Sequence, residues 1–175
     1  LPRRSDLKGL SEAGAAYIIK IQKQRKRTVT CDEMSEHMVY TGEYASPLGT
    51  ITVAYEEAAI IGLWFNGQKH FGNILPKQTE QKEHPLLADA RRWLDVYFSG
   101  REPDFLPPLR YDSTPFRRQV CEIMLTIPYG KTMTYGEIAA EIARRQNLPK
   151  MSAQAVGGAV GHNPISLMIP CHRVV

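Results

Sequence analysis

Along residues 40–65, apolar and polar positions alternate, and the apolar positions are rich in β-branched and aromatic side chains. Such alternation is typical of half-buried strands. It predicts strands at residues 40–46, 51–55 and 59–65. Because only short turns at 47–49 and 56–57 separate these strands, we expect an antiparallel meander.

Residues 66–83 form a polar stretch with scattered glycines, which predicts a loop. The apolar spacing then becomes helical, with Pro85 suited to a first helical position and Gly100 to the end of the helix. The apolar face of this helix consists of Leu87, Ala90, Leu94, Tyr97 and Phe98. A proline-rich segment at 103–108 indicates a domain boundary.

Further capped helices are predicted in the last third of the chain. Thr114 and Pro115 begin the first of them. Its buried stripe is Phe116, Val120, Ile123, Met124 and Ile127. Thr134 and Glu137 have the spacing of a capping box at the start of the next helix. Ser152 is a candidate N-cap for a third helix, which runs to about residue 161. One side of this helix carries only small residues, namely Ala155, Gly157, Gly158 and Ala159.

The last two helices, joined by a short turn at 147–150, are a candidate helix-turn-helix, although many unrelated helix pairs share this pattern. Together the elements predict an α+β fold, with a three-stranded antiparallel sheet and a helix in an N-terminal lobe and a helical C-terminal lobe. We expect the domains to be an extension at 1–38, the α+β lobe at 39–108 and the helical lobe at 109–175. Residues 7–26 have a helical spacing, but a solvated arm is the simpler interpretation of the extension.

The composition excludes several classes of protein. With 175 residues, 43% of them hydrophobic, the chain is long enough for a sizeable core and is not disordered throughout. It contains no apolar run of bilayer-spanning length and no apolar segment of a secretory signal near residue 1. The three cysteines are too scattered for a disulfide framework. We therefore expect a cytoplasmic protein with no membrane partner.

The net charge of +4 is unevenly distributed. Basic residues are in excess over 1–38 and 110–175, whereas acidic residues are in excess over 39–109. A polyanion is therefore expected to dock on a terminal part of the chain, although a charged run is more often only a solvated face.

The most informative segment is Pro170-Cys171-His172-Arg173, which follows an apolar run. Proline restricts the backbone before the cysteine, and neighbouring cations favour the thiolate form. A thiolate is the soft nucleophile that attack on saturated carbon requires. Taken by itself, the segment also fits a buried cysteine beside a surface His-Arg pair.

Several other blocks accompany this segment, namely residues 116–120, 127–131, 134–139, 155–158 and 163–164. With them, residues 113–175 closely resemble the O6-alkylguanine-DNA alkyltransferases, also called methylated-DNA–protein-cysteine methyltransferases. Residues 40–100 look like the less diagnostic N-terminal lobe of that family. The resemblance implies a winged-helix-like helix-turn-helix in the C-terminal lobe.

The resemblance also implies direct reversal of DNA damage by a monomer without a cofactor. The helix-turn-helix would dock in the minor groove of double-stranded DNA, and the alkylated base would be flipped into a pocket. The alkyl group would move irreversibly to Cys171, so that each molecule acts once. The range of alkyl groups, and the choice between O6-alkylguanine and O4-alkylthymine, stay open.

The family's roles carry over to matching positions of this chain. Cys171 would be the nucleophile, and His172 would take its proton through a water molecule. Tyr135 would donate a hydrogen bond to the leaving base, and Asn163 would order the pocket. The backbone carbonyls of Cys171 and Val174 would accept from the exocyclic amine. The substrate pocket would include Val160, Ile169, Pro170 and Val174. The DNA contacts would come from Arg118, Ser152, Ala153, Gln154, Gly157, Gly158 and Arg173.

Simpler interpretations of these residues stay open. Tyr135 also fits a core aromatic and Asn163 a turn former, and the glycine pair would also permit close helix packing. Cys121, beside the buried stripe, is expected to be a packing cysteine. Cys31, His37 and His84 lack the spacing of a zinc site, so we expect no metal.

Two departures from the family pattern affect these expectations. Gln154 stands where the family commonly has an arginine finger that fills the space of the flipped base. The given sequence stops at Val175, whereas family members continue with a wing-like loop and a helix whose glutamate orients the histidine. Without those elements, the pocket would be open on one side and activity would be poor.

Two other functions are alternatives to alkyl transfer. A lesion-binding relative would flip the base without transferring the group, but such relatives replace the nucleophile that Cys171 retains. A regulator would use only the helix-turn-helix. The mass of the intact protein after incubation with methylated DNA distinguishes the three.

Overall fold

A computed structural model of the chain describes residues 38–175, which belong to one compact unit. The expectations for the extension, for the helical spacing at 7–26, and for Cys31 and His37 lie outside these residues. None of the helices in the described range is long and apolar enough to cross a membrane.

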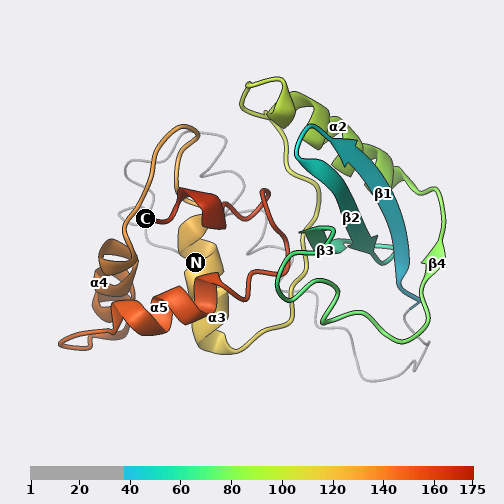
Figure 1. The fold of residues 1–175 in the computed structure, drawn as a ribbon. Coiled ribbons are helices and arrows are strands. Elements are labelled where there is room, and N and C mark those ends of the chain that lie inside the picture. The colour runs from blue at the N-terminus through green and yellow to red at the C-terminus, as the bar shows by residue number, and fades with distance from the viewer. Residues whose placement is uncertain (1–37) are drawn as a thin grey trace. The chain divides into compact units, whose positions relative to one another are not determined.

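The structure is α+β, and its sheet is mixed. The strands are β1 (Tyr40–Ser46), β2 (Gly49–Tyr55), β3 (Ile60–Phe65) and β4 (Glu80–Gln81), in the order β3-β2-β1-β4 (Figure 1). The first three form the predicted antiparallel meander. The short β4 lies parallel to β1 within the region expected to be a loop, so a purely antiparallel, three-stranded sheet is wrong. Glu80 and Gln81 are exposed and polar, so only backbone hydrogen bonds make them a strand.

Both faces of the central strands are covered. β2 and β3 bury nearly every residue, because one face packs against the main core and the other against a small second cluster. The second cluster consists of Val39, Ala54, Ile61 and Trp64, with Leu75 packed against it. This coverage explains why the alternation in β3 is incomplete.

The helix α2 (Pro85–Phe98) packs against the sheet with Leu87, Ala90 and Leu94 buried. The side chain of His84 accepts a hydrogen bond from the N–H of Leu86 at its start. The backbone of β1 approaches the helix so closely that a Cβ on Gly42 would lie 2.3 Å from a Leu87 methyl. Gly42 is therefore required by packing.

The other helices are α3 (Pro115–Met124), α4 (Tyr135–Gln146) and α5 (Ala153–Val160). Each predicted cap is present. Thr114 and Ser152 accept N–H groups of the first turns of α3 and α5, and Thr134 and Glu137 form the complete capping box of α4. Because a cap satisfies N–H groups that the helix leaves unpaired, these positions begin the helices where the sequence predicts.

The outer edge of β3 holds two distant segments of the chain. The N–H of Leu63 donates to the Pro164 carbonyl at 2.9 Å, and the N–H of Ser166 donates back to the Leu63 carbonyl at 2.8 Å. Ile60 makes a similar pair of bonds with the carbonyl of Pro108 and the N–H of Arg110. The main core runs without a break from β2 and α2 to residues 165–174. The segment that precedes Cys171 is thereby anchored on the sheet.

Candidate active site

Cys171 begins a short 3₁₀ turn (Cys171–Arg173) directly after Pro170. Its N–H donates to the Ile169 carbonyl at 2.8 Å, and its carbonyl accepts the N–H of Val174 at 3.1 Å. Its side chain is half-buried, so the thiol is both held and reachable. These backbone hydrogen bonds hold the main chain of Cys171 in place.

Cys121, the other cysteine of the described range, is fully buried in α3. Burial raises the pKa of its thiol to about 12, and the nearby Cys171 and Glu122 add to the effect. A thiol in that environment stays protonated and is a poor nucleophile. The structure places Cys121 as the packing residue that the sequence predicts.

Asn163 clamps the loop that leads to the cysteine. Its side-chain nitrogen donates to the carbonyls of Ile169 at 2.8 Å and Ile165 at 3.3 Å, and its side-chain oxygen accepts the N–H of Ile165 at 3.0 Å. The buried amide therefore joins both ends of residues 165–169. Since Ile169 also accepts the N–H of Cys171, Asn163 determines where the cysteine lies.

The start of α4 is joined to the residues after the cysteine. The N–H of Met133 donates to the Arg173 carbonyl, and the N–H groups of Val175 and Tyr135 complete the pairing, all at 3.0–3.1 Å. Tyr135 is therefore held beside the cysteine turn, with its ring against Gly157 of α5. The pairing brings together two motifs that lie far apart in the sequence.

His172 contacts a residue that the sequence did not identify as functional. Its Nε2 lies 2.7 Å from the hydroxyl of Tyr97 in α2, and the two rings meet edge to face. Tyr97 is itself stacked on Trp93. Desolvation lowers the pKa of His172, and the positive charge of Arg173 lowers it further. The imidazole is therefore neutral at physiological pH.

Arg173, expected on the DNA surface, has partners within the protein. Its guanidinium donates to the Ile127 carbonyl at 3.2 Å and lies 5.1 Å from the centre of the Tyr129 ring. These contacts hold the end of the cysteine turn against the segment between α3 and α4. Arg118 is exposed, and its guanidinium donates to the Ser113 carbonyl at 3.3 Å.

Most of the remaining predicted site residues are either buried in the core or exposed on α5. The predicted pocket residues are buried, namely Val160, Ile169, Pro170 and Val174. On α5, Ala153, Gln154, Ala155 and Gly158 are exposed, and Ser152 before it is exposed as well. Gly157 is half-buried under Tyr135. One side of α5 thus faces solvent with only small or uncharged side chains.

The glycines of α5 are not required by packing inside the protein. A Cβ built on Gly158 meets nothing within 4 Å, and one on Gly157 makes only ordinary contact with Tyr135. Glycine inside a helix costs about 1 kcal/mol relative to alanine. These two positions therefore carry a helix cost that contacts within the described residues do not explain.

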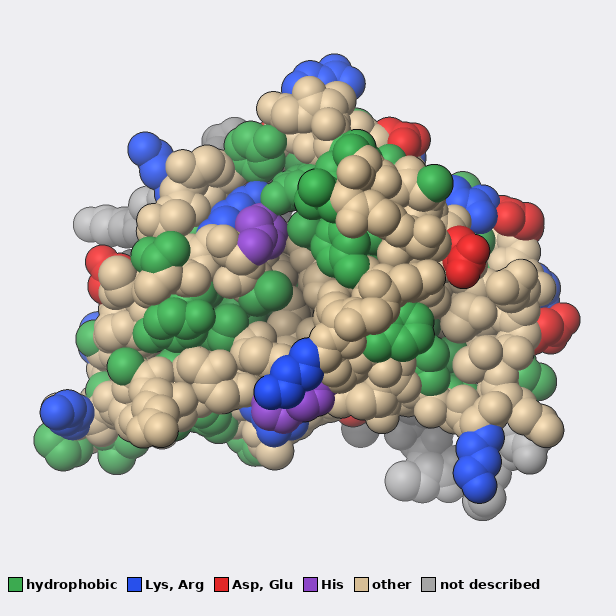
Figure 2. Space-filling model, viewed as in Figure 1, with side chains coloured by type: hydrophobic (Ala, Val, Ile, Leu, Met, Phe, Trp, Pro, Cys, Tyr) green, Lys and Arg blue, Asp and Glu red, His purple; other side chains and the backbone are tan. Residues whose placement is uncertain are grey.

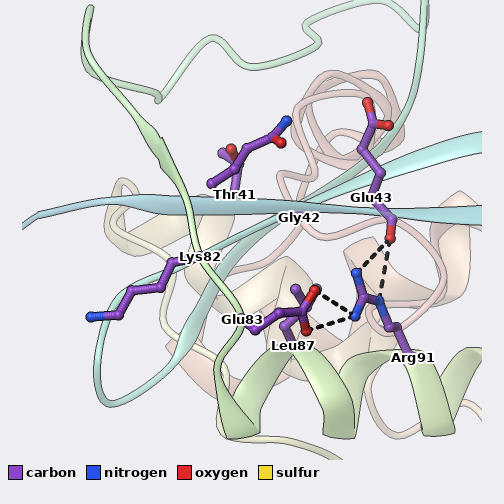
Figure 3. Close-up of a pocket in the computed structure, with 8 residues that line it drawn as sticks. Thr41, Gly42, Glu43, Lys82, Glu83, Leu87 and Arg91 are labelled. Carbon is purple, nitrogen blue, oxygen red and sulfur yellow. Dashed lines mark hydrogen bonds and ion pairs between the residues drawn. The ribbon is translucent and has the colours of Figure 1, made fainter.

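A cavity of about 360 Å³ lies elsewhere, between β1, the β4 segment and α2 (Figure 3). None of the predicted site residues lines it. Its arginine, Arg91, is already bound by both carboxylate oxygens of Glu83 and by the Glu43 carbonyl. In the described range no group of three or more potential metal ligands occurs, and His84 serves as the helix cap.

Two family models together match most of the described residues. Residues 39–111 match the family model for the ribonuclease-like domain of 6-O-methylguanine DNA methyltransferase, and residues 115–175 match the model for its DNA-binding domain. The chain is 36% identical over 138 residues to a methylated-DNA–protein-cysteine methyltransferase of Haemophilus influenzae, covering 78% of this chain and 73% of the relative. It is 35% identical over 139 residues to the constitutive enzyme of Bacillus subtilis, covering 79% and 81%.

Solved structures give the same result. The chain superposes on the Mycobacterium tuberculosis O6-methylguanine methyltransferase with a TM-score of 0.67 and 34% identity, over 79% of each chain. It also superposes on M. tuberculosis OGT in complex with DNA, with a TM-score of 0.64 and 34% identity, over 79% of this chain and 78% of that one. The protein thus belongs to the O6-methylguanine-DNA methyltransferase family, whose members repair DNA by transferring the methyl group to a cysteine of their own.

Proposed function

We propose that Cys171 is the cysteine that receives the alkyl group and that the reaction consumes the protein. The observation that carries the proposal is the rigid frame around a half-buried thiol, in which Asn163 and Pro170 determine the position of Cys171. Cys121 is buried and its pKa is raised, so it does not compete. The sulfur forms a bond to the alkyl carbon while the bond from that carbon to O6 breaks. The resulting thioether is stable, which makes the transfer irreversible.

We assign the acceptance of the thiol proton to His172, acting through a water molecule. When Nε2–H of the neutral ring donates to the Tyr97 hydroxyl, Nδ1 is left as the basic nitrogen. The lowered pKa of His172 keeps this nitrogen free of a proton near neutral pH. Tyr97 thereby acts as a positioning residue that holds the ring in this orientation.

We assign the hydrogen bonding of the leaving base to Tyr135 and to two backbone carbonyls. Tyr135 would donate to the base as negative charge develops on it. The carbonyls of Cys171 and Val174 would accept from the exocyclic amine. The buried side chains of Val160, Ile169, Pro170 and Val174 would form the pocket.

For DNA docking we assign α4 and α5 as a winged-helix-like helix-turn-helix, with α5 in the minor groove. The exposed, small-residue side of α5 supports this assignment, because only short side chains let a helix backbone approach a narrow groove. The target base would be flipped out of the stack by a monomer of the protein. Arg118 and Ser152 are assigned to phosphates, and Ala153, Gln154, Gly157 and Gly158 to the groove.

The test is the mass of the intact protein after incubation with duplex DNA containing O6-methylguanine. We expect the unmodified chain to gain the mass of one methyl group, located on Cys171 by peptide mapping. We expect Cys171→Ser to gain nothing while its affinity for DNA stays within about threefold. Cys121→Ser is the matched control and should react fully. Methylation of Cys121 or Cys31 in the Cys171 variant would refute the assignment.

A further inference from the structure

A pair of histidines outside the cysteine site carries a further inference. His70, in the loop after β3, and His162, just beyond α5, have stacked rings with centres 4.5 Å apart. Nδ1 of His162 lies 2.7 Å from the Gly158 carbonyl. Since a carbonyl only accepts, Nδ1 carries the hydrogen, and Nε2 is the nitrogen left to bind a proton or an external group.

The pair lies within a cluster of positive charge. Desolvation lowers the pKa of His70, and the positive charges of His162, Lys69 and Arg117 lower it further. Within residues 38–175, the carboxylates that form ion pairs do so with other arginines, at positions 91, 92, 110, 144 and 145. Figure 2 shows histidine side chains beside lysine and arginine side chains at the lower edge of the viewed face. None of these ion pairs includes a residue of the cluster.

The cluster continues the exposed side of α5. Positions 154, 158 and 162 are four residues apart, and all three are exposed. The loop that carries Lys69 and His70 is held in place, because Ser166 Oγ donates to Gln68 Oε1 at 3.3 Å and Gln68 accepts the N–H of Phe65. Any duplex that lies along α5 would therefore meet the cluster at the C-terminal end of the helix.

We propose that Lys69, His70, Arg117 and His162 form a binding site for a phosphate of the DNA backbone, and that binding there adds a proton to the histidine pair. The proposal rests on the docking of DNA along α5. In the free protein, desolvation and the repulsion of neighbouring positive charges lower the pKa of His70. A phosphate placed between four cationic groups removes this repulsion and accepts hydrogen bonds from protonated imidazole. The sheet-containing half of the chain would thereby contribute directly to DNA binding.

The coupling between phosphate binding and protonation of the histidines determines how DNA affinity changes with pH. Phosphate raises the histidine pKa in the complex above that in the free protein, where the pKa of His70 lies below its ordinary value of 6.5. Affinity therefore rises as pH falls through the pKa of the complex, and levels off below the pKa of the free protein. One linked proton gives at most about a tenfold change in Kd per pH unit.

The experiment measures the Kd of a Cys171→Ala chain for an undamaged duplex between pH 5.5 and 8.0 at constant ionic strength. The key variant combines His70→Asn with His162→Gln. Asparagine is chosen because His70 has a φ of 65°, which asparagine tolerates. We expect the parent Kd to fall by about fivefold or more toward acidic pH, and the double variant to lose at least half of that change. His172 is present in both proteins, so its titration cancels in the comparison.

A second comparison uses two exposed lysines of the same loop. Lys69→Gln should reduce the slope of log Kd against log salt by about one, whereas the matched control Lys77→Gln should not change it. Identical pH profiles for parent and double variant, or equal effects of the two lysine variants, would overturn the phosphate site. If one of these results is obtained while the chain with Cys171 still transfers methyl groups, only the phosphate site is overturned. A chain that neither binds DNA nor transfers methyl groups would overturn the proposed function as well.

Discussion

At the scale of single residues, Tyr97 links the sheet-packed helix α2 to His172, the proposed proton acceptor. A phenol hydroxyl can accept Nε2–H or donate to a bare Nε2, so it orients a neutral imidazole without giving it a charge. A carboxylate in this position would also raise the basicity of the ring, which a phenol does far less. We therefore expect the contact between Tyr97 and His172 to make a modest contribution to the rate of methyl transfer.

We expect Tyr97→Phe to slow methyl transfer about fivefold, since one such hydrogen bond contributes about 1 kcal/mol and about 1.4 kcal/mol corresponds to tenfold in rate. Phenylalanine keeps the stacking on Trp93, so stability and DNA affinity should change little. The rate of the unmodified protein should fall as pH is lowered through the pKa of His172, and the variant should show a shifted profile. Single-turnover kinetics across pH provide the measurement.

Tyr44→Phe is the matched control for this prediction. The Tyr44 hydroxyl donates to Asp95 of the same helix at 2.8 Å but does not touch His172. Replacing Tyr44 with phenylalanine removes a comparable hydrogen bond and should leave the rate of methyl transfer and its pH profile unchanged. Equal slowing by both variants would reduce Tyr97 to a packing role.

Gln154 makes a second prediction at this scale, because it is exposed on α5 where the family commonly carries an arginine. We expect Gln154→Arg to strengthen duplex binding and to steepen its salt dependence by about one counterion. The added cation should also speed repair of duplex DNA by stabilising the flipped base. Reaction with free O6-methylguanine base, which needs no flipping, should hardly change. An equal effect on both substrates would place residue 154 in the pocket wall.

At the scale of elements, α5 combines a good N-cap with two glycines that packing does not require. Gly158→Ala should therefore stabilise the protein by about 0.5–1 kcal/mol, because alanine favours the helix and meets no atom. The same methyl group should weaken DNA binding about tenfold or more, because it prevents close approach to the groove. Urea unfolding and fluorescence anisotropy measure the two effects on one variant.

Ala155→Gly supplies the opposite change on the same exposed side of the helix. It should destabilise the protein by about 1 kcal/mol and leave DNA affinity within about twofold. If Gly158→Ala instead lowers stability and affinity together, the glycine serves folding and the docking surface must lie elsewhere.

Elements with a local signal were the ones that could be predicted from the sequence. Thr114, Thr134 and Ser152 mark the starts of α3, α4 and α5 because capping depends only on neighbouring residues. β4 could not be predicted, because two exposed polar residues pair with β1 through backbone alone. The same limit applies to the site. Cys171 and His172 stand in one motif, whereas Tyr97 lies 75 positions away from His172 and carries no sign of its role beyond helical spacing.

At the scale of the whole molecule, the described residues behave as one packed body. The main core is continuous between the sheet and the cysteine segment, and β3 hydrogen-bonds directly to residues 164 and 166. The clamp formed by Asn163 therefore depends on the sheet as well as on its own loop. Loss of the sheet should release the cysteine segment.

We therefore expect residues 38–175 to unfold in one transition, and the chain offers probes in both parts. Its two tryptophans, Trp64 and Trp93, are buried in β3 and α2, while Cys121 is buried in α3. In urea, the change in tryptophan fluorescence should share its midpoint with pulse labelling of Cys121, quantified by peptide mapping. Labelling of Cys121 at lower urea than the fluorescence change would show that the helices unfold first and that the β3 contacts are weak. Coincident midpoints would mean that the sheet and α3 are stabilised together, because neither can be exposed without breaking the core they share.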